Sequence, residues 1–411
     1  MIRSLLAPIL AHTSFRSALQ ALAAGTSQSA APPALSGLTG SAKAMVAAGI
    51  AHELGRPVVV LTSDNEAAAN LQRTTSTFLA WLEPPSSPPV LTLPEMDCSP
   101  YEGRSPHAEI LEQRAVTLWR IAQGRARVLY VPAAAALGRF RERRFYSSLA
   151  LELKAGDELD LGDLAEHLTG VGYERGEPVS DVGQFSLRGG IVDAFPPEAA
   201  WPFRIEFSGD QIESLREFDP DTQRSRRPVQ QALLLPLSEV KGSRQFFSRL
   251  AAAAAKRVAA RRPAATPARG QPEAEPEWAN EVSSPFPGWE FFAPWVEPHP
   301  HSLLALFDNP VVLWDEPLER KRQMASFREG LASAFDEIRD VVPPRPSPEE
   351  IFRSEQEFLE SLWRTPQLYL KELPLVPAPE ASAESHRPLE IAEFGEETPS
   401  PPTPLPQGGE G

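Results

Sequence analysis

The chain has 411 residues, of which 42% are hydrophobic and 23% charged, an ordinary composition for a globular protein with room for two or three domains. A formal net charge of −15 argues against broad, sequence-independent wrapping of nucleic acid, because neutralising phosphates needs a concentrated basic surface. The single cysteine, Cys98, excludes an intramolecular disulfide and a cysteine-cluster metal site, and it fits a reducing cytoplasm. No run approaches about 20 apolar residues, so no membrane-spanning helix is expected.

The first third of the chain predicts alternating helices and strands. Residues 1 to about 35 are typical of an amphipathic helix followed by an Ala/Ser/Pro linker. The apolar run Val58–Leu61 predicts a strand between two helical segments, as in the βαβ units of a parallel sheet. A further helix is predicted from about Glu109 to Ile121, with an apolar stripe that packs in the core.

The loop GLTGSAKA has the spacing of a phosphate-binding P-loop, in which backbone N–H groups cradle phosphates and a lysine reaches the terminal ones. Gly37, Gly40 and Lys43 fit that pattern. Ala42 stands where the second glycine is expected, and Ala44 stands where a Ser or Thr would bind Mg²⁺. We therefore expect a helix start that keeps the geometry of a P-loop without its chemistry, and nucleotide binding is the less favoured alternative.

The stretch Val182–Pro220 predicts a strand, a tight turn, a second strand and a hairpin. Apolar and polar residues alternate around the Gly-Gly pair at 189–190 and again before a Ser-Gly-Asp turn. This alternation places Arg188, Arg204 and Glu206 together on one solvent-facing side of a sheet. A charged sheet face is most often only a solvated surface, and a docking surface is the alternative.

Downstream of this stretch the α/β pattern returns. Residues 244–270 predict a basic, Ala-rich helix and a Pro/Gly linker; the helix either packs its apolar residues inward, which we favour, or lies on nucleic acid. Val311–Trp314 predicts a buried strand, and Asp315 and Glu316 follow at its carboxyl end, where ligands bind in open α/β sheets. The end of the chain, rich in Pro, Glu, Ser and Gly, predicts a disordered tail.

The segments LRGGIVDAFP, RIEFSGDQIES and EFDPDTQRS resemble the UvrA-binding domain shared by UvrB and the transcription-repair coupling factors (Mfd). The degenerate P-loop resembles the coupling factors more than UvrB, and the short path from Leu93 to Glu109 leaves no room for the DNA-locking hairpin of UvrB. The resemblance covers roughly residues 1–370. The family continues with an RNA-polymerase-interacting domain and a two-lobed DNA motor, so we expect a truncated or split gene.

The resemblance implies an α/β fold with a discontinuous RecA-like parallel sheet and an inserted α+β UvrA-binding domain. The expected division is an N-terminal helix and linker (1–35), a first RecA-like part with a degenerate P-loop (36–145), the UvrA-binding domain (146–238), a second RecA-like part (239–370) and a disordered tail (371–411).

The resemblance also implies a set of site residues. Arg175 and Arg188 correspond to arginines with which UvrB and the coupling factors contact UvrA, whereas Ser186 replaces a further arginine of UvrB. Phe185, Arg204 and Glu206 complete the expected UvrA-binding set. Asp315 and Glu316 resemble the relic of a Walker B motif, and together with Gly37, Gly40 and Lys43 they make up the expected degenerate nucleotide site.

We therefore expect a cytoplasmic, UvrA-recruiting module of transcription-coupled nucleotide-excision repair, with no catalytic residues, no metal and no cofactor. Neither ATP nor Mg²⁺ is expected to bind. UvrA is the expected partner, DNA is expected to bind weakly at most, and RNA polymerase only through domains beyond this sequence. Two alternatives stay open, an ATP-dependent DNA translocase, which Ala42 and Ala44 argue against, and an inert fragment.

Overall fold

The computed structural model describes residues 2–25, 31–261, 284–338 and 344–372. All of these residues belong to one unit, Met1–Leu373. The predicted disordered tail lies, from residue 373 onward, outside the described residues. The same holds for residues 26–30 of the first predicted linker and for residues 262–283.

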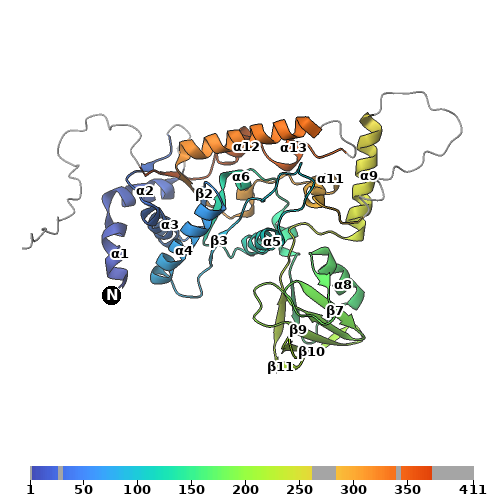
Figure 1. Cartoon of the computed structure of the whole chain (residues 1–411). Helices are drawn as coiled ribbons and strands as arrows, with labels where there is room; N and C mark the ends of the chain where they lie inside the picture. The colour runs from blue at the N-terminus through green and yellow to red at the C-terminus, as the bar shows by residue number, and fades with distance from the viewer. Residues whose placement is uncertain (1, 26–30, 262–283, 339–343, 373–411) are drawn as a thin grey trace, which may run out of the picture. The chain divides into compact units, whose positions relative to one another are not determined.

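A six-stranded parallel sheet is built from two distant segments of the chain (Figure 1). In spatial order its strands are β1 (Ala34–Leu35), β14 (Gln367–Leu370), β13 (Val311–Asp315), β2 (Val58–Thr62), β4 (Val128–Pro132) and β3 (Val90–Thr92), and every neighbouring pair runs parallel. The predicted strands at Val58 and Val311 are therefore confirmed, and the sheet is discontinuous in sequence, as expected.

The parallel sheet separates two hydrophobic cores, because alternate residues of each central strand point to opposite faces. In β2, Val58 and Val60 belong to one core, whereas Val59 and Leu61 belong to the other. Helices α1 (Ile2–Ala11), α2 (Thr13–Ala24), α3 (Gly40–Leu54) and α4 (Asn65–Leu82) contribute to the first core. Helices α5 (Ala108–Ala122), α6 (Ala133–Ala136), α12 (Pro317–Ile338) and α14 (Glu355–Ser361) contribute to the second. Burial on both faces explains why the central strands are apolar except at their carboxyl ends, Thr62 in β2 and Asp315 in β13.

The segment between the two halves of the parallel sheet forms a second six-stranded sheet and a two-stranded one. The larger sheet has the order β11 (Ser225–Pro228), β10 (Gln211–Phe218), β9 (Phe203–Ser208), β8 (Ile191–Ala194), β7 (Gln184–Arg188) and β6 (Glu174–Arg175), antiparallel except between β6 and β7. The smaller sheet pairs β12 (Gln231–Leu234) with β5 (Leu151–Lys154), and α8 spans Leu161–Gly170. The predicted α/β class with an inserted β-rich part is confirmed.

The turn between β7 and β8 depends on glycine at two adjacent positions. Gly189 has a φ of +59°, in the left-handed region that glycine tolerates best. A Cβ on Gly190 would lie 2.9 Å from the carbonyl oxygen of Phe207 on β9. Gly209, with a φ of +65°, closes the hairpin of β9 and β10. The predicted succession of strand, turn, strand and hairpin is therefore confirmed.

The remaining described elements are α7 (Arg143–Ser147), α9 (Arg244–Arg261), η1 (Trp289–Phe292), α11 (Ala293–Val296), η2 (Leu303–Leu306) and α13 (Pro348–Ile351). The basic helix α9 buries Phe246, Phe247 and Leu250 in a cluster that also contains Phe292 and Trp295. The favoured interpretation of this helix, inward packing of its apolar residues, is confirmed.

The N-terminal region departs from the prediction of one helix and a linker. Two helices form, and the side chain of His12 between them accepts a hydrogen bond from the N–H of Ser14 at the start of α2. Ala34–Leu35 is a strand because its backbone extends the parallel sheet beside β14. The division into five segments stays a prediction. Among the described residues, no helix has the length and apolar character needed to cross a membrane.

Candidate functional site

One face of the larger antiparallel sheet carries a row of polar side chains. Cross-strand pairs join Ser186 to Asp193, Asp193 to Arg204, and Arg204 to Arg216. Directly paired residues point to the same side of a sheet, so these four side chains share a face. Residues two positions along on the same strands belong to that face as well. We call it the arginine face; its polar members are Ser186, Arg188, Asp193, Arg204, Glu206, Ser214 and Arg216.

Asp193 is the centre of an ion cluster on the arginine face. Its side chain is 0% exposed. Arg204 donates hydrogen bonds from Nε to Oδ1 of Asp193 at 2.7 Å and from Nη2 to Oδ2 at 2.8 Å. Arg188 donates from Nη2 to Oδ2 at 3.0 Å. A buried carboxylate is costly without paired cations, and here two guanidinium groups surround one carboxylate, which leaves a positive charge over.

The two arginines of this cluster differ in exposure. The Arg204 side chain is only 16% exposed, and its guanidinium lies 4.7 Å from the ring centre of Phe218. The hydrogen bonds with Asp193 raise the pKa of Arg204. The expectation that Arg204 faces solvent is therefore wrong, because Asp193 draws its charge into the sheet. The Arg188 side chain is 45% exposed, so Arg188 carries the charge that a partner can reach.

Glu206 also lies on the arginine face but is engaged with its neighbours on β10. Its carboxylate accepts a hydrogen bond from the hydroxyl of Ser214. It also forms an ion pair with Nη2 of Arg216 at 3.4 Å. The predicted placement of Glu206 beside Arg188 and Arg204 on one face is confirmed by the register, since Glu206 pairs with Ile191, which in turn pairs with Arg188.

The other candidate residues are placed differently. Phe185 is completely buried, and Ser186 is nearly so, which means that their side chains support the face rather than form its surface. Arg175 lies on the edge strand β6, in register with Phe185 and with its guanidinium 5.5 Å from that ring centre. Arg175 and Arg188 are both exposed, but Arg175 pairs with Phe185 and therefore lies on the side of the sheet opposite the arginine face.

The residues of the expected nucleotide site do come together at the carboxyl end of the parallel sheet. Lys43 lies in the first turn of α3, Asp315 ends β13, and Glu316 follows it. Nζ of Lys43 donates to Oδ1 of Asp315 at 2.6 Å and to Oε1 of Glu316 at 2.7 Å. Burial by itself lowers the pKa of Lys43, but the hydrogen bonds to the two carboxylates outweigh burial and raise this pKa above its ordinary value of 10.5.

This arrangement does not fit a nucleotide. A P-loop lysine binds phosphate oxygens, whereas Lys43 is occupied by two carboxylates whose negative charge repels phosphate. Glu316 is itself fixed, since Oε1 also accepts the N–H of Glu372 at 2.6 Å. Ala44 is fully buried and has no hydroxyl for Mg²⁺. A Cβ on Gly37 or on Gly40 would meet no other atom within 4 Å, so neither glycine is packed closely against the rest of the protein.

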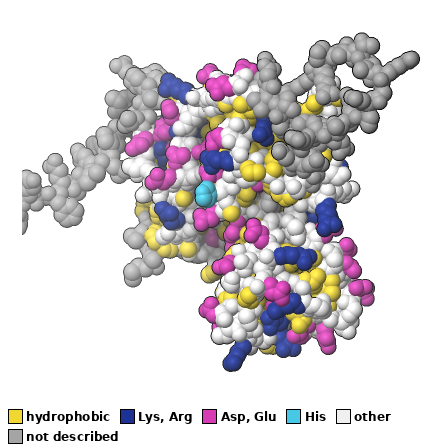
Figure 2. Space-filling view, turned by 45° about the vertical axis from the view of Figure 1, so that its right-hand side comes forward, with side chains coloured by type: hydrophobic (Ala, Val, Ile, Leu, Met, Phe, Trp, Pro, Cys, Tyr) yellow, Lys and Arg dark blue, Asp and Glu magenta, His cyan; other side chains and the backbone are white. Residues whose placement is uncertain are grey.

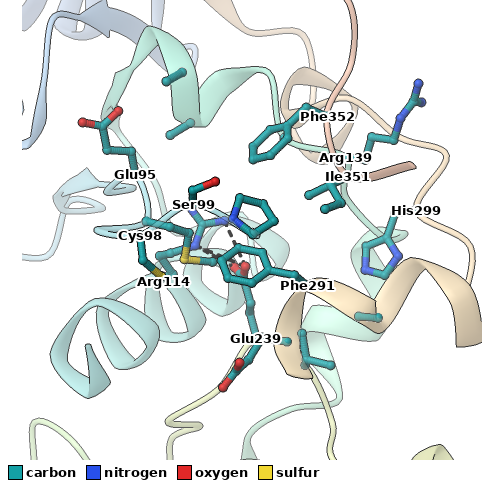
Figure 3. A pocket seen from close by; sticks show the side chains of 18 of the residues that line it. Glu95, Cys98, Ser99, Arg114, Arg139, Glu239, Phe291, His299, Ile351 and Phe352 are labelled. Atoms are coloured by element: carbon teal, nitrogen blue, oxygen red, sulfur yellow. Dashed lines mark hydrogen bonds and ion pairs between the residues drawn. The ribbon is translucent and has the colours of Figure 1, made fainter. Parts of the chain in front are cut away.

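A cavity of about 510 Å³, which the sequence did not indicate, is lined by residues of α5, α12, η1 and α11 (Figure 3). Figure 3 shows Arg114 and Glu239 on one side of it and His299 on the other. Arg114 and Glu239 form an ion pair at 3.0 Å. Burial raises the pKa of the Cys98 thiol to about 11 and lowers the pKa of His299 to about 4, so both side chains are uncharged near neutral pH.

Asp193 is the functional side chain that sequence reasoning missed. Its signal was present, because Asp193 is the one polar residue in a strand otherwise made of Ile, Val and Ala, and a two-residue turn at Gly189–Gly190 pairs that strand with the one that carries Arg188. An acidic residue between two strands that each carry an arginine predicts a cross-strand ion pair. The side chain's complete burial could not be read from that alternation.

Residues 151–239 match the protein-family model of the UvrB interaction domain. The inserted β-rich part is therefore similar to UvrB interaction domains. It extends from the start of β5 to just beyond β12, and it contains the whole arginine face.

The chain is similar to transcription-repair-coupling factors of several bacteria. It is 36% identical to that of Myxococcus xanthus over 205 residues, 33% identical to that of Escherichia coli (strain K12) over 202 residues, and 30% identical to that of Bacillus subtilis (strain 168) over 230 residues. These alignments cover 50%, 49% and 54% of this chain, but only 17%, 17% and 19% of the relatives. The chain thus spans under a fifth of their length. The predicted resemblance to the coupling factors is confirmed, over a shorter stretch than the 370 residues expected.

Proposed function

We propose that this chain is a UvrA-recruiting module of transcription-coupled nucleotide-excision repair and that it binds UvrA through the arginine face. The observation that carries the proposal is Arg188, a half-exposed arginine anchored on a buried carboxylate within a UvrB interaction domain. The mechanism is binding without chemistry: a rigid sheet presents the guanidinium group, and charge-assisted hydrogen bonds to an acidic group of UvrA set the orientation.

Arg175 is the second arginine that we assign to UvrA binding, at the sheet edge and outside the arginine face. It is exposed on the edge strand β6, and no ion pair is found for it in the described part of the chain. An exposed arginine without an internal partner does not have to break an ion pair before it binds a new one. Arg204 has the opposite character, because Asp193 already takes up its guanidinium group, and we assign it a supporting role.

The test is a titration of the purified chain against UvrA from the same organism. The wild-type chain should bind with saturation, and Arg188→Ala should weaken binding by about 30-fold or more, the effect of losing a residue that dominates an interface. Arg144→Ala is the matched control, because Arg144 has an 85% exposed side chain on α7, outside the sheet, and should leave affinity unchanged. Equal affinity for wild type and Arg188→Ala would remove the arginine face from the proposal.

We further propose that the chain has no ATPase activity of its own. The carboxylates of Asp315 and Glu316 occupy Lys43, and Ala44 offers no metal ligand, so ATP would have to break two short ion pairs to reach a loop without its phosphate-binding groups. Equilibrium dialysis with ATP and Mg²⁺ should detect no stoichiometric binding. Saturable binding near one ATP per chain would contradict this proposal without affecting that of UvrA binding.

We propose no strong nucleic-acid binding for the described residues. Cationic and anionic side chains lie interspersed on the surface that Figure 2 shows, whereas phosphate wrapping needs a continuous basic surface. A filter-binding measurement with duplex DNA should give weak affinity that falls steeply as salt concentration rises. The DNA-motor and RNA-polymerase activities of coupling factors are not assigned to this chain.

A further inference from the structure

Asp193 cannot itself touch a binding partner, because its side chain is fully buried. It nevertheless occupies the centre of the arginine face, on β8, between Arg188 on β7 and Arg204 on β9. Its direct cross-strand neighbour, Ser186, has a buried hydroxyl oxygen without a hydrogen-bond partner in the described part of the chain. The two arginines, and not the serine, therefore satisfy the carboxylate of Asp193.

The two arginines use Asp193 in different ways. Arg204 binds it through two nitrogens, Nε and Nη2, in a bidentate pair that takes up both carboxylate oxygens. Arg188 binds it through Nη2 alone. The only other ion pair of Arg188 in the described residues is a loose one, at 3.7 Å, from Nε to the exposed carboxylate of Glu177. The Nη1 nitrogen of Arg188 therefore stays free for an outside acceptor.

This difference determines where the charge of the cluster lies. The bidentate Arg204 neutralises Asp193, so the charge of Arg188 is not cancelled although its guanidinium is held in place. The guanidinium of Arg188 is thus held at one nitrogen, Nη2, while the rest of this planar group is exposed and its charge is not taken up by Asp193. A planar fork held in this way matches the geometry of a carboxylate better than a freely rotating side chain does.

We propose that Asp193 is a positioning residue, which holds the guanidinium of Arg188 in the orientation that pairs with a carboxylate of UvrA. This inference rests on the proposed UvrA-binding function. It concerns pre-organisation: an arginine that is already ordered loses less side-chain freedom on binding than one that must be ordered at that moment. Asp193 contributes to affinity without contacting UvrA.

The experiment is a double-mutant cycle, with affinity for UvrA measured by titration and folding checked by circular dichroism. Asp193→Asn keeps the side-chain shape but removes the charge, and it should weaken binding about tenfold, the order of the cost of immobilising one flexible side chain. In the Arg188→Ala background the same substitution should cause no further loss, because Asp193 acts through Arg188. Additive losses, or wild-type affinity of a folded Asp193→Asn chain, would overturn the proposal.

Glu217→Gln is the matched control. Glu217 is a nearly buried carboxylate on β10 that forms a similar bidentate pair, with Arg227, at 2.7 and 2.8 Å. In register it pairs with Phe203, which pairs with Ala194, so it lies on the opposite side of the sheet from Asp193. Arg175 lies on that side too, but on β6, at the far edge of the sheet from β10. It should leave affinity for UvrA unchanged, whereas a merely structural effect of losing a buried carboxylate would weaken binding in both variants.

Arg188→Lys decides the question where Asp193→Asn does not fold. Lysine keeps the positive charge, but its ammonium group is not planar and cannot donate to Asp193 and to a partner carboxylate in the way that a guanidinium does. Arg188→Lys should therefore lose affinity to within about twofold of Arg188→Ala, and wild-type affinity of this variant would overturn the proposal. Failure of the wild-type chain to bind UvrA would instead refute the proposed function.

Discussion

Lys43→Met tests whether the remnant of the nucleotide site is now a structural ion cluster. The substitution keeps the length and apolar stem of the side chain and removes the charge from between Asp315 and Glu316. The Lys43 side chain is 8% exposed, and the two carboxylates are mostly buried beside it. The variant therefore leaves two adjacent, partly desolvated negative charges without a cation.

The magnitude follows from burial and distance. Two unit charges 4 Å apart interact by about 4 kcal/mol at an effective dielectric constant of 20. Removing one partner of a buried pair costs about 3–5 kcal/mol. Water reaches Glu316 more easily than Asp315, so we expect the lower end, about 3 kcal/mol of destabilisation at pH 7.

Native-state hydrogen exchange, followed on peptides that contain β2 and β13, gives the free energy of opening of the parallel sheet itself. Lys154→Met is the matched control, since Lys154 forms an exposed ion pair with Glu152 at 2.9 Å, and it should show no measurable change. The wild-type contribution of Lys43 is fully present below pH 10.5 and should be lost as pH rises through the raised pKa. A Lys43→Met chain as stable as wild type at pH 7 would refute the ion-cluster reasoning.

Two further predictions concern the UvrB interaction domain. Burial and the charge of Lys241 lower the pKa of His167 from 6.5 to about 4, so the unfolded chain takes up the proton first, and domain stability should fall from pH 6.5 to pH 4. His167→Gln should flatten this dependence in urea unfolding, and an unchanged slope would contradict it. Gly190→Ala should cost about 1–3 kcal/mol, because its Cβ would lie 2.9 Å from a carbonyl oxygen. Gly330→Ala, with open space on α12, is the control, and equal stabilities of the two variants would contradict the steric argument.

The fold could be predicted where local patterns carry the tertiary information. The runs at Val58 and Val311 are wholly apolar because both faces of the parallel sheet are covered, and the alternation in β7 and β9 follows from one face being buried. The short strand Ala34–Leu35 could not be predicted, because two residues carry no periodicity and their pairing with β14 joins positions more than three hundred residues apart. The order of the parallel strands depends on such distant pairings.

The candidate site was predictable in composition but not in burial. Alternation places Arg188, Arg204 and Glu206 on one face, yet it assigns all three to solvent. It cannot show that Asp193 draws the side chain of Arg204 inward. That contact depends on the pairing of β8 with β9, which brings together two residues eleven positions apart in sequence. Likewise, the spacing of residues around Lys43 indicated a degenerate nucleotide site. The ion pair of Lys43 with Asp315 could not be predicted, because these residues lie 272 positions apart in sequence.

The two charged clusters of this chain, around Lys43 and around Asp193, have opposite ratios of cations to anions. At the parallel sheet, two carboxylates face one lysine, so the cation is over-neutralised and the site is closed to anions. On the arginine face, two guanidinium groups face one buried carboxylate, that of Asp193. The only other carboxylate paired with Arg188 in the described residues, Glu177, is exposed and 3.7 Å away, so much of the charge of Arg188 stays accessible at the surface. The ratio of charges in each cluster, and not its mere presence, therefore separates a structural ion pair from a surface able to bind an acidic partner. That criterion supports the arginine face, and not the loop around Lys43, as the proposed surface for an acidic partner.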